Sequence, residues 1–395
     1  MGFVDRPQRV WWRMAMFQIH LWVGIALCLY MLVIGVTGSI LVFESELEHI
    51  AYPQLWRTTD PSLGKQTVDL PAVIATVTQA YRGYKITAAY VPDKPGDNFE
   101  VFIHQGAAFR YVFIDANSGR IVGTINPDRS WLVWIIELHF NLLGGRVGEI
   151  LNGIGAACLL LLCATGAVVW WAGFKHWTRG LKVNVHKSWR RINFDLHSAV
   201  GFWTLLILSM WAFTGVYFVW PRPIESFVNR FSSIASANPP VFVVPQPGNE
   251  PWVDLHRMIE QAQRSSPNAK FAGAFFPGND KNALTLLMAR GAARNFSQMD
   301  YVYFDPATGR QLALWHRGIN STWGGSFIFW LSPLHFGYDW GLAIKILWAA
   351  LGCALPLLSI TGVLMYWNRS LSKKWKMLLR EGSFDARKEA ESRSR

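Results

Sequence analysis

Two similar apolar stretches decide how this chain is organised. They read HLWVGIALCLYMLVIGVTG at residues 20–38 and HSAVGFWTLLILSMWAFTG at residues 197–215. Each begins with His, has Gly four residues later and ends in Thr-Gly, with the Thr 17 residues after the His. Neither contains a charged residue, and a helix of this length approaches the roughly 30 Å of a bilayer's hydrocarbon core. The sequence therefore predicts two equivalent membrane-spanning helices.

A second pair of matching segments accompanies two further spans. His139 is followed by Thr165-Gly166, and His335 is followed by Thr361-Gly362, in both cases with the Thr 26 residues after the His. Between the spans, the alternating segments at residues 111–115 and 301–305 also resemble each other, and each is followed by Gly-Arg. Alternation of this kind is typical of β-strands. The chain thus consists of two similar halves.

These observations predict a mainly α membrane protein with four principal transmembrane helices. The helices form a parallel two-fold internal repeat about an axis along the membrane normal, with two α+β external segments. The expected ranges are the N-terminal segment with the first span (1–43), an external segment (44–130), the second span (131–174), a basic loop (175–195), the third span (196–221), an external segment (222–330), the fourth span (331–368) and a tail (369–395).

Composition and charge agree with a membrane protein. Only 16% of the residues are charged, against roughly 25% in soluble domains. The net charge of +12 comes largely from Lys and Arg in the N-terminal segment, the loop 175–195 and the tail. Because these basic residues flank the spans, they indicate topology and not nucleic-acid binding. The positive-inside rule places both termini and this loop in the cytoplasm.

The paired histidines are the candidate ligands. The repeat axis would place His20 opposite His197 near the cytoplasmic surface, and His139 opposite His335 near the periplasmic surface. Two neutral imidazoles can hold a haem iron from both sides, whereas zinc wants more ligands at each site. The alternative is that each His is a hydrogen-bonded structural group. No C-x-x-C-H motif is present, so any haem would not be covalently attached.

Further residues are weaker candidates. A flat macrocycle needs close approach of helix backbone, so four glycines are assigned to the haem pockets: Gly24, Gly201, Gly145 and Gly341. The Thr-Gly pairs are interpreted as helix-packing positions whose hydroxyl bonds its own helix. Substrate or haem-edge roles are considered for His316, Trp323, Trp330, Arg129 and Arg146, against the simpler interpretation that they are interfacial aromatic residues and membrane-flanking charges. No catalytic residue is identified.

The repeated His and Thr-Gly pattern resembles the PepSY-associated transmembrane helix family, and within it the haem-containing siderophore reductases of the Gram-negative inner membrane. The resemblance covers nearly the whole chain. It implies two haem b groups and transfer of electrons to a ferric siderophore in the periplasm, from a quinol or a cytosolic reductant. Two alternatives stay open: a cytochrome that relays electrons to a partner protein, and a non-redox regulatory or binding protein of the PepSY type.

Overall fold

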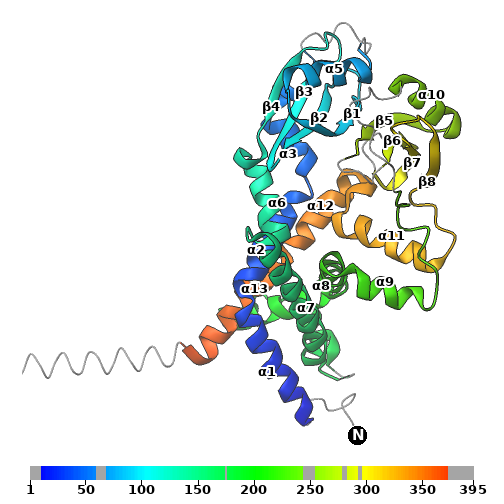
Figure 1. The fold of residues 1–395 in the computed structure, drawn as a ribbon. Coiled ribbons are helices and arrows are strands. Elements are labelled where there is room, and N and C mark those ends of the chain that lie inside the picture. Colours follow the sequence, from blue (N-terminus) through cyan, green and yellow to red (C-terminus); the bar gives the residue numbers. More distant parts are fainter. Residues whose placement is uncertain are drawn as a thin grey trace, which may run out of the picture. The chain divides into compact units, whose positions relative to one another are not determined.

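The computed structural model describes residues 10–58, 68–173, 176–242, 254–277, 283–291 and 296–371. These residues fall into two compact units (Figure 1). The membrane unit comprises Met1–Val42, Glu137–Pro221 and Leu342–Arg395, and the sheet unit comprises Phe43–Ile136 and Arg222–Gly341. The first nine residues, residue 174 at the end of the expected second span, residue 175 at the start of the expected basic loop and most of the expected tail lie outside the described residues.

The membrane unit is helical. Among the described residues, three segments are long and apolar enough to cross a membrane, and a bent helix pair makes up to four. The helices of the three segments are α7 (Gly145–Trp170), α8 (Trp189–Val219) and the consecutive α12 (Gly341–Gly352) and α13 (Ala354–Tyr366). The bent pair is α1 (Trp11–Ala26) and α2 (Cys28–Leu41). A 3-10 helix, η4 (Trp177–Leu181), lies between α7 and α8, and a short π-helix (Trp367–Leu371) follows α13.

Three of the expected spans, the first, the second and the fourth, are not single straight helices. The fourth is interrupted between α11 (Trp323–Phe336) and α12 by Gly337 and the 3-10 turn at Tyr338–Trp340. The first bends by 64° between α1 and α2. The second is broken between α6 (Trp131–Asn141) and α7, where Leu142 and Leu143 take positive φ angles of 51° and 58°. The physical reason is length, because 26 continuous helical residues from His139 to Thr165 would cover about 39 Å, more than the hydrocarbon core.

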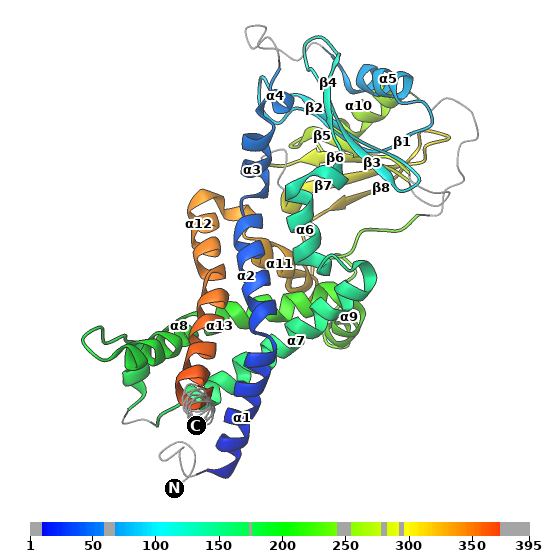
Figure 2. The same cartoon turned by 90° about the vertical axis from the view of Figure 1, so that its left-hand side faces the viewer.

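Apolar packing holds the membrane helices together. A core cluster takes residues from α2, α7, α8 and α13, among them Met31, Leu162, Leu208 and Leu355. Helix α7 packs along α8, and α2 runs beside α13 (Figure 2). Helices that are far apart in the sequence therefore share one core, which brings polar residues from both halves of the chain close together.

The sheet unit contains one antiparallel sheet of eight strands in the order β4-β3-β2-β1-β5-β6-β7-β8. The strands of the two expected α+β segments pair with each other in this one sheet. The strands are β1 (Lys85–Tyr90), β2 (Phe99–Gln105), β3 (Ala108–Ile114), β4 (Ile121–Ile125), β5 (Lys270–Phe275), β6 (Leu284–Ala289), β7 (Met299–Phe304) and β8 (Gln311–His316).

Helices α5 (Leu70–Ala80) and α10 (Leu255–Ser265) share one hydrophobic core with this sheet. Val73 and Val77 of α5 and Met258 and Ala262 of α10 are buried against strand residues from both halves. The remaining helices are α3 (Glu44–Ala51), α4 (Pro53–Trp56), α9 (Pro221–Asn229), α11 (Trp323–Phe336) and the short 3-10 turns η3 (Pro127–Arg129), η5 (Phe296–Gln298) and η6 (Tyr338–Trp340).

The two halves of the sheet join at β1 and β5. Ala89 and Ala274 are each the fifth residue of their strand, and they lie opposite one another in the antiparallel register. The register is therefore symmetric about this pair, and each half covers the strand edge that the other would expose. At this junction a Cβ on Gly273 would lie 2.4 Å from the carbonyl oxygen of Ala89. Only glycine allows the backbones this close approach.

This close approach gives a test of the junction. Gly273→Val should push β5 away from β1 and destabilise the sheet unit by about 2 kcal/mol or more. Hydrogen exchange followed by mass spectrometry should then show faster amide exchange in both strands. Thr124→Val, at an exposed position of edge strand β4, is the control and should change little. Unchanged exchange in β1 and β5 of the Gly273 variant would contradict this account of the junction.

Candidate functional site

The structure brings His20 and His197 together. Their ring centroids are 6.4 Å apart, and the ring planes are nearly perpendicular at 84°. His20 lies on α1 and His197 on α8, near the start of the equivalent apolar stretches. Both side chains are partly buried within the membrane unit. The sequence expectation that these two imidazoles face each other therefore agrees with the geometry, and their role as ligands stays a prediction.

Each of the two rings is held by a threonine on another helix. Nδ1 of His197 lies 2.9 Å from Oγ1 of Thr361, and Nδ1 of His20 lies 3.2 Å from Oγ1 of Thr165. The hydroxyls already donate to their own helices, from Thr361 to the Leu357 carbonyl at 2.7 Å and from Thr165 to the Leu161 carbonyl at 2.8 Å. A hydroxyl has a single proton, so each Oγ1 must accept from the ring.

This arrangement selects one tautomer. If the Thr oxygen accepts, Nδ1 carries the proton and the lone pair is left on Nε2. For His20 a second contact indicates the same tautomer. Its Nδ1 also lies 3.2 Å from the Leu162 carbonyl oxygen, which can only accept a hydrogen bond. An imidazole held by its Nδ1–H and offering Nε2 is the usual form of a metal-ligating histidine.

A third His and Thr pair has the same form. Nδ1 of His139 lies 2.9 Å from Oγ1 of Thr37, whose hydroxyl donates to the Val33 carbonyl at 2.7 Å. The glycine after each Thr leaves room for the ring: a Cβ would lie 2.9 Å from Cε1 of His139 at Gly38, 3.0 Å from that of His20 at Gly166 and 3.4 Å from that of His197 at Gly362. The Thr-Gly pair is thus a seat for a histidine on another helix.

Sequence reasoning missed this role of the Thr-Gly pairs. It interpreted them as packing positions with a hydroxyl bonded to its own helix. The bond within the helix is present at Thr37, Thr165 and Thr361. The signal that pointed further was the constant His-to-Thr spacing in both halves. A second missed residue is Asn193, which is buried one turn before His197 and whose Nδ2 donates to the Thr361 carbonyl at 3.0 Å. It supports the threonine that holds His197.

The spacing of the His20–His197 pair is compatible with two imidazoles on one metal centre, and a haem at this place stays a prediction. With metal–nitrogen bonds of about 2 Å, imidazoles on opposite sides of one metal have ring centres roughly 6 Å apart, close to the spacing here. Within the described residues, no group of three or more His, Cys, Asp or Glu gathers that could hold a metal ion by itself. A site with two protein ligands suits a metal whose other ligands come from a macrocycle.

The other predicted pair is divided between the units. His139 belongs to the membrane unit and His335 to the sheet unit, so their meeting stays a prediction. At Gly24 and Gly201 a Cβ would lie at ordinary contact distance, 3.8 Å from Leu162 and 3.7 Å from Leu358.

For Gly145 and Gly341 the structure gives a reason other than a haem pocket. They open α7 and α12 at positive φ angles of 53° and 76°, with no described atom within 4 Å of a Cβ. Both are therefore needed for backbone conformation.

The five residues considered for substrate or haem-edge roles do not form one cluster with each other in the described contacts. Nδ1 of His316 lies 2.8 Å from the buried carboxylate of Asp300. Arg146 pairs with Glu149 at 2.7 Å and is largely exposed, Arg129 is exposed in η3, and Trp323 is exposed at the start of α11. Trp330 lines a pocket in the sheet unit. His316 and Arg146 thus each have a carboxylate partner, and their proposed substrate or haem-edge roles stay predictions.

Comparison with known proteins identifies the family. The model of the PepSY-associated TM region matches residues 17–369. The chain belongs to this family. The match includes all four paired histidines and all four Thr-Gly pairs. With the apolar helices, it makes the chain a multi-pass protein of a lipid bilayer.

One relative is an uncharacterized protein of Pseudomonas aeruginosa, 25% identical over 261 residues. That alignment covers 60% of this chain, and the chain spans 64% of the relative's length. This similarity indicates a relationship between the two proteins and does not indicate an activity.

The histidine seat can be tested without any cofactor. Thr361→Val keeps the shape of the side chain but removes the hydroxyl that accepts from Nδ1–H of His197, which should cost about 1 kcal/mol or more of stability. Thr361→Ser should restore most of this. Thr204→Val is a matched control, because the Thr204 hydroxyl donates to its own helix at Val200 and has no histidine partner among the described residues. Thermal unfolding in detergent provides the measurement, and equal losses for Thr361→Val and Thr204→Val would contradict the seat.

Proposed function

We propose that this protein is an inner-membrane di-haem b oxidoreductase, which passes electrons across the membrane to reduce ferric siderophores in the periplasm. One observation carries the proposal: two imidazoles on different helices lie 6.4 Å apart, each held by its Nδ1 so that Nε2 can serve as a ligand. A structural histidine needs one hydrogen-bond partner, but it does not need a second histidine facing it.

The protein's own residues supply position and environment. His20 and His197 would hold the inner haem, and Thr165 and Thr361 would fix the two ring orientations. Haem iron supplies one-electron redox chemistry when bound. The apolar core of α2, α7, α8 and α13 keeps water away from the region between the two faces of the membrane unit. The hydrogen bonds at Nδ1 also raise the basicity of the ligands, which favours the oxidised metal.

The outer site is proposed from the repeat. His139 has the same kind of threonine seat as the inner histidines, and His335 is its counterpart in the second half of the chain. These two residues would hold the second haem near the periplasmic face. One electron from a quinol or a cytosolic reductant would then cross the membrane and convert one ferric ion to ferrous, which siderophores bind less tightly. The basic loop and both termini are placed in the cytoplasm in this scheme.

Two other functions make different predictions. A cytochrome that relays electrons to a partner protein would contain haem but would not be reoxidised directly by ferric chelates. A non-redox protein, which would use the eight-stranded sheet to bind a partner, would keep its function without the four histidines. The facing histidines with defined tautomers favour the redox candidates, since a purely scaffolding role gives no reason for the pair.

The test is a haem count together with single substitutions. The purified protein should contain about two haems per chain, and His20→Ala and His197→Ala should each remove the same one of them. His139→Ala and His335→Ala should each remove the other. Reduced-minus-oxidised spectra and a pyridine haemochrome assay measure both quantities, and mixing the reduced protein with a ferric siderophore measures electron transfer.

The matched control is His256→Ala, because His256 lies exposed on α10 in the sheet unit. It should leave the haem count unchanged. Fewer than one haem per chain in protein purified after growth with ample haem would overturn the proposal. Loss of both haems from one substitution in a folded protein would contradict two separate sites.

A further inference from the structure

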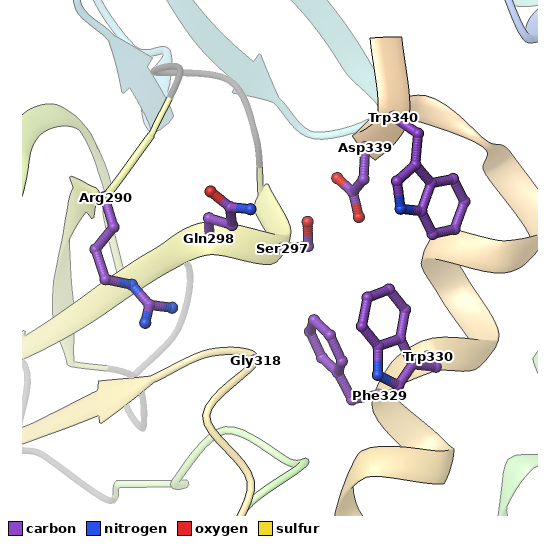
Figure 3. A pocket seen from close by; sticks show the side chains of 8 residues that line it. All are labelled: Arg290, Ser297, Gln298, Gly318, Phe329, Trp330, Asp339 and Trp340. Atoms are coloured by element: carbon purple, nitrogen blue, oxygen red, sulfur yellow. The ribbon is translucent and has the colours of Figure 1, made fainter. Parts of the chain in front are cut away.

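A pocket lies within the sheet unit. Its volume is about 360 Å³, the size of a site for a small organic molecule. One side is formed by Arg290, just after β6, and by η5, and the other by α11 and η6 (Figure 3). The residues on which its chemistry depends are Arg290, Ser297, Phe329, Trp330, Asp339 and Trp340.

Aromatic faces form one wall of the pocket. Trp330 of α11 and Trp340 of η6 stack with ring centroids 6.0 Å apart and planes inclined by 7°. Phe329 extends the same wall, beside Trp330 (Figure 3). Both tryptophans remain accessible, with 44% and 38% of their surface exposed. The face of an indole ring is electron-rich and attracts cations more strongly than any other side-chain ring.

A carboxylate lies next to this wall. Asp339 extends toward Ser297 (Figure 3), yet its Oδ1 is buried and accepts no hydrogen bond from any described residue. Burial raises the pKa of Asp339 above its ordinary value, although the Ser297 hydroxyl and the Arg317 charge oppose the shift. A buried carboxylate oxygen without a donor costs free energy that a bound cation would offset.

The positive charge on the opposite wall is already matched. Nε of Arg290 lies 3.0 Å from Oδ1 of Asp300, and the Arg290 side chain also donates to the Arg317 carbonyl. Asp300 is almost fully buried and has His316 as a further partner. The Arg290 charge is thus held by Asp300, whereas Oδ1 of Asp339, on which the Arg317 charge also acts, accepts no hydrogen bond from a described residue.

We propose that this pocket binds an organic ammonium group, with the cation against Trp330 and Trp340 and beside the Asp339 carboxylate. The volume admits a ligand of the size of choline or a small amine, and it is too small to enclose a bulky ferric chelate. The site is therefore distinct from the proposed redox function and does not depend on it.

Ammonium groups of this kind have two sources. One is a free amine in solution, and the other is the headgroup of a lipid such as phosphatidylethanolamine. The chemistry recognised in the pocket is the same, so the experiment has one arm for each source.

The first arm uses calorimetric titration of the detergent-solubilised full chain with choline. Saturable binding is expected, and 3,3-dimethylbutan-1-ol, which has the same shape without the charge, should bind at least about tenfold more weakly. Asp339→Asn and Trp330→Ala should each weaken choline binding about tenfold or more. Trp323→Ala is the matched control, because Trp323 lies exposed on the same helix outside the pocket lining, and it should bind choline like the wild type.

The second arm repeats the titration in nanodiscs with and without phosphatidylethanolamine. Weaker apparent choline binding when the lipid is present identifies the headgroup as the source, and unchanged binding identifies a free amine. Thermal unfolding of each variant shows whether a loss of binding reflects a loss of fold. Absence of saturable choline binding, equal affinity for the uncharged analogue, or equal loss in Trp323→Ala and Trp330→Ala would overturn the proposal.

Discussion

The hydrogen bond between a histidine Nδ1 and a threonine on another helix is the constraint on which the membrane unit depends. A polar group in the hydrocarbon core has no water to bond, so each buried ring nitrogen must find a protein acceptor. A threonine hydroxyl meets this need because its own proton is used within its helix. The bond joins α1 to α7, α6 to α2, and α8 to α13, and it sets how each ring is turned.

The same pairs explain why small residues follow the threonines. A Cβ would lie only 2.9 Å from Cε1 of the ring at Gly38 and 3.0 Å at Gly166, so a larger residue there would crowd the histidine, whereas at Gly362 the distance is 3.4 Å. The threonine therefore accepts the hydrogen bond of the histidine, and the glycine after it lies against the imidazole ring. The break at Leu142–Gly144 belongs to the same geometry, since it separates the helix that carries His139 from the one that carries Thr165.

In the sheet unit the controlling constraint is the unpaired strand edge. Each external segment supplies four strands, and β1 and β5 would be open edges if the segments were separate, which invites non-native pairing. Pairing them removes both edges at once and makes the core under α5 and α10 continuous. The two segments are therefore parts of one unit, although more than a hundred residues separate β4 from β5 in the sequence.

The sequence by itself determined the apolar spans, the pairing of His20 with His197 and the strand-rich external segments, because hydrophobic length, alternation and an internal repeat can be read along the chain. Only the tertiary structure decided that Thr165 and Thr361 hold His20 and His197, that eight strands form one sheet, and that Trp330 and Asp339 share a pocket. Those contacts join residues from different elements, and their distances depend on how helices and strands pack and not on the pattern within any one of them.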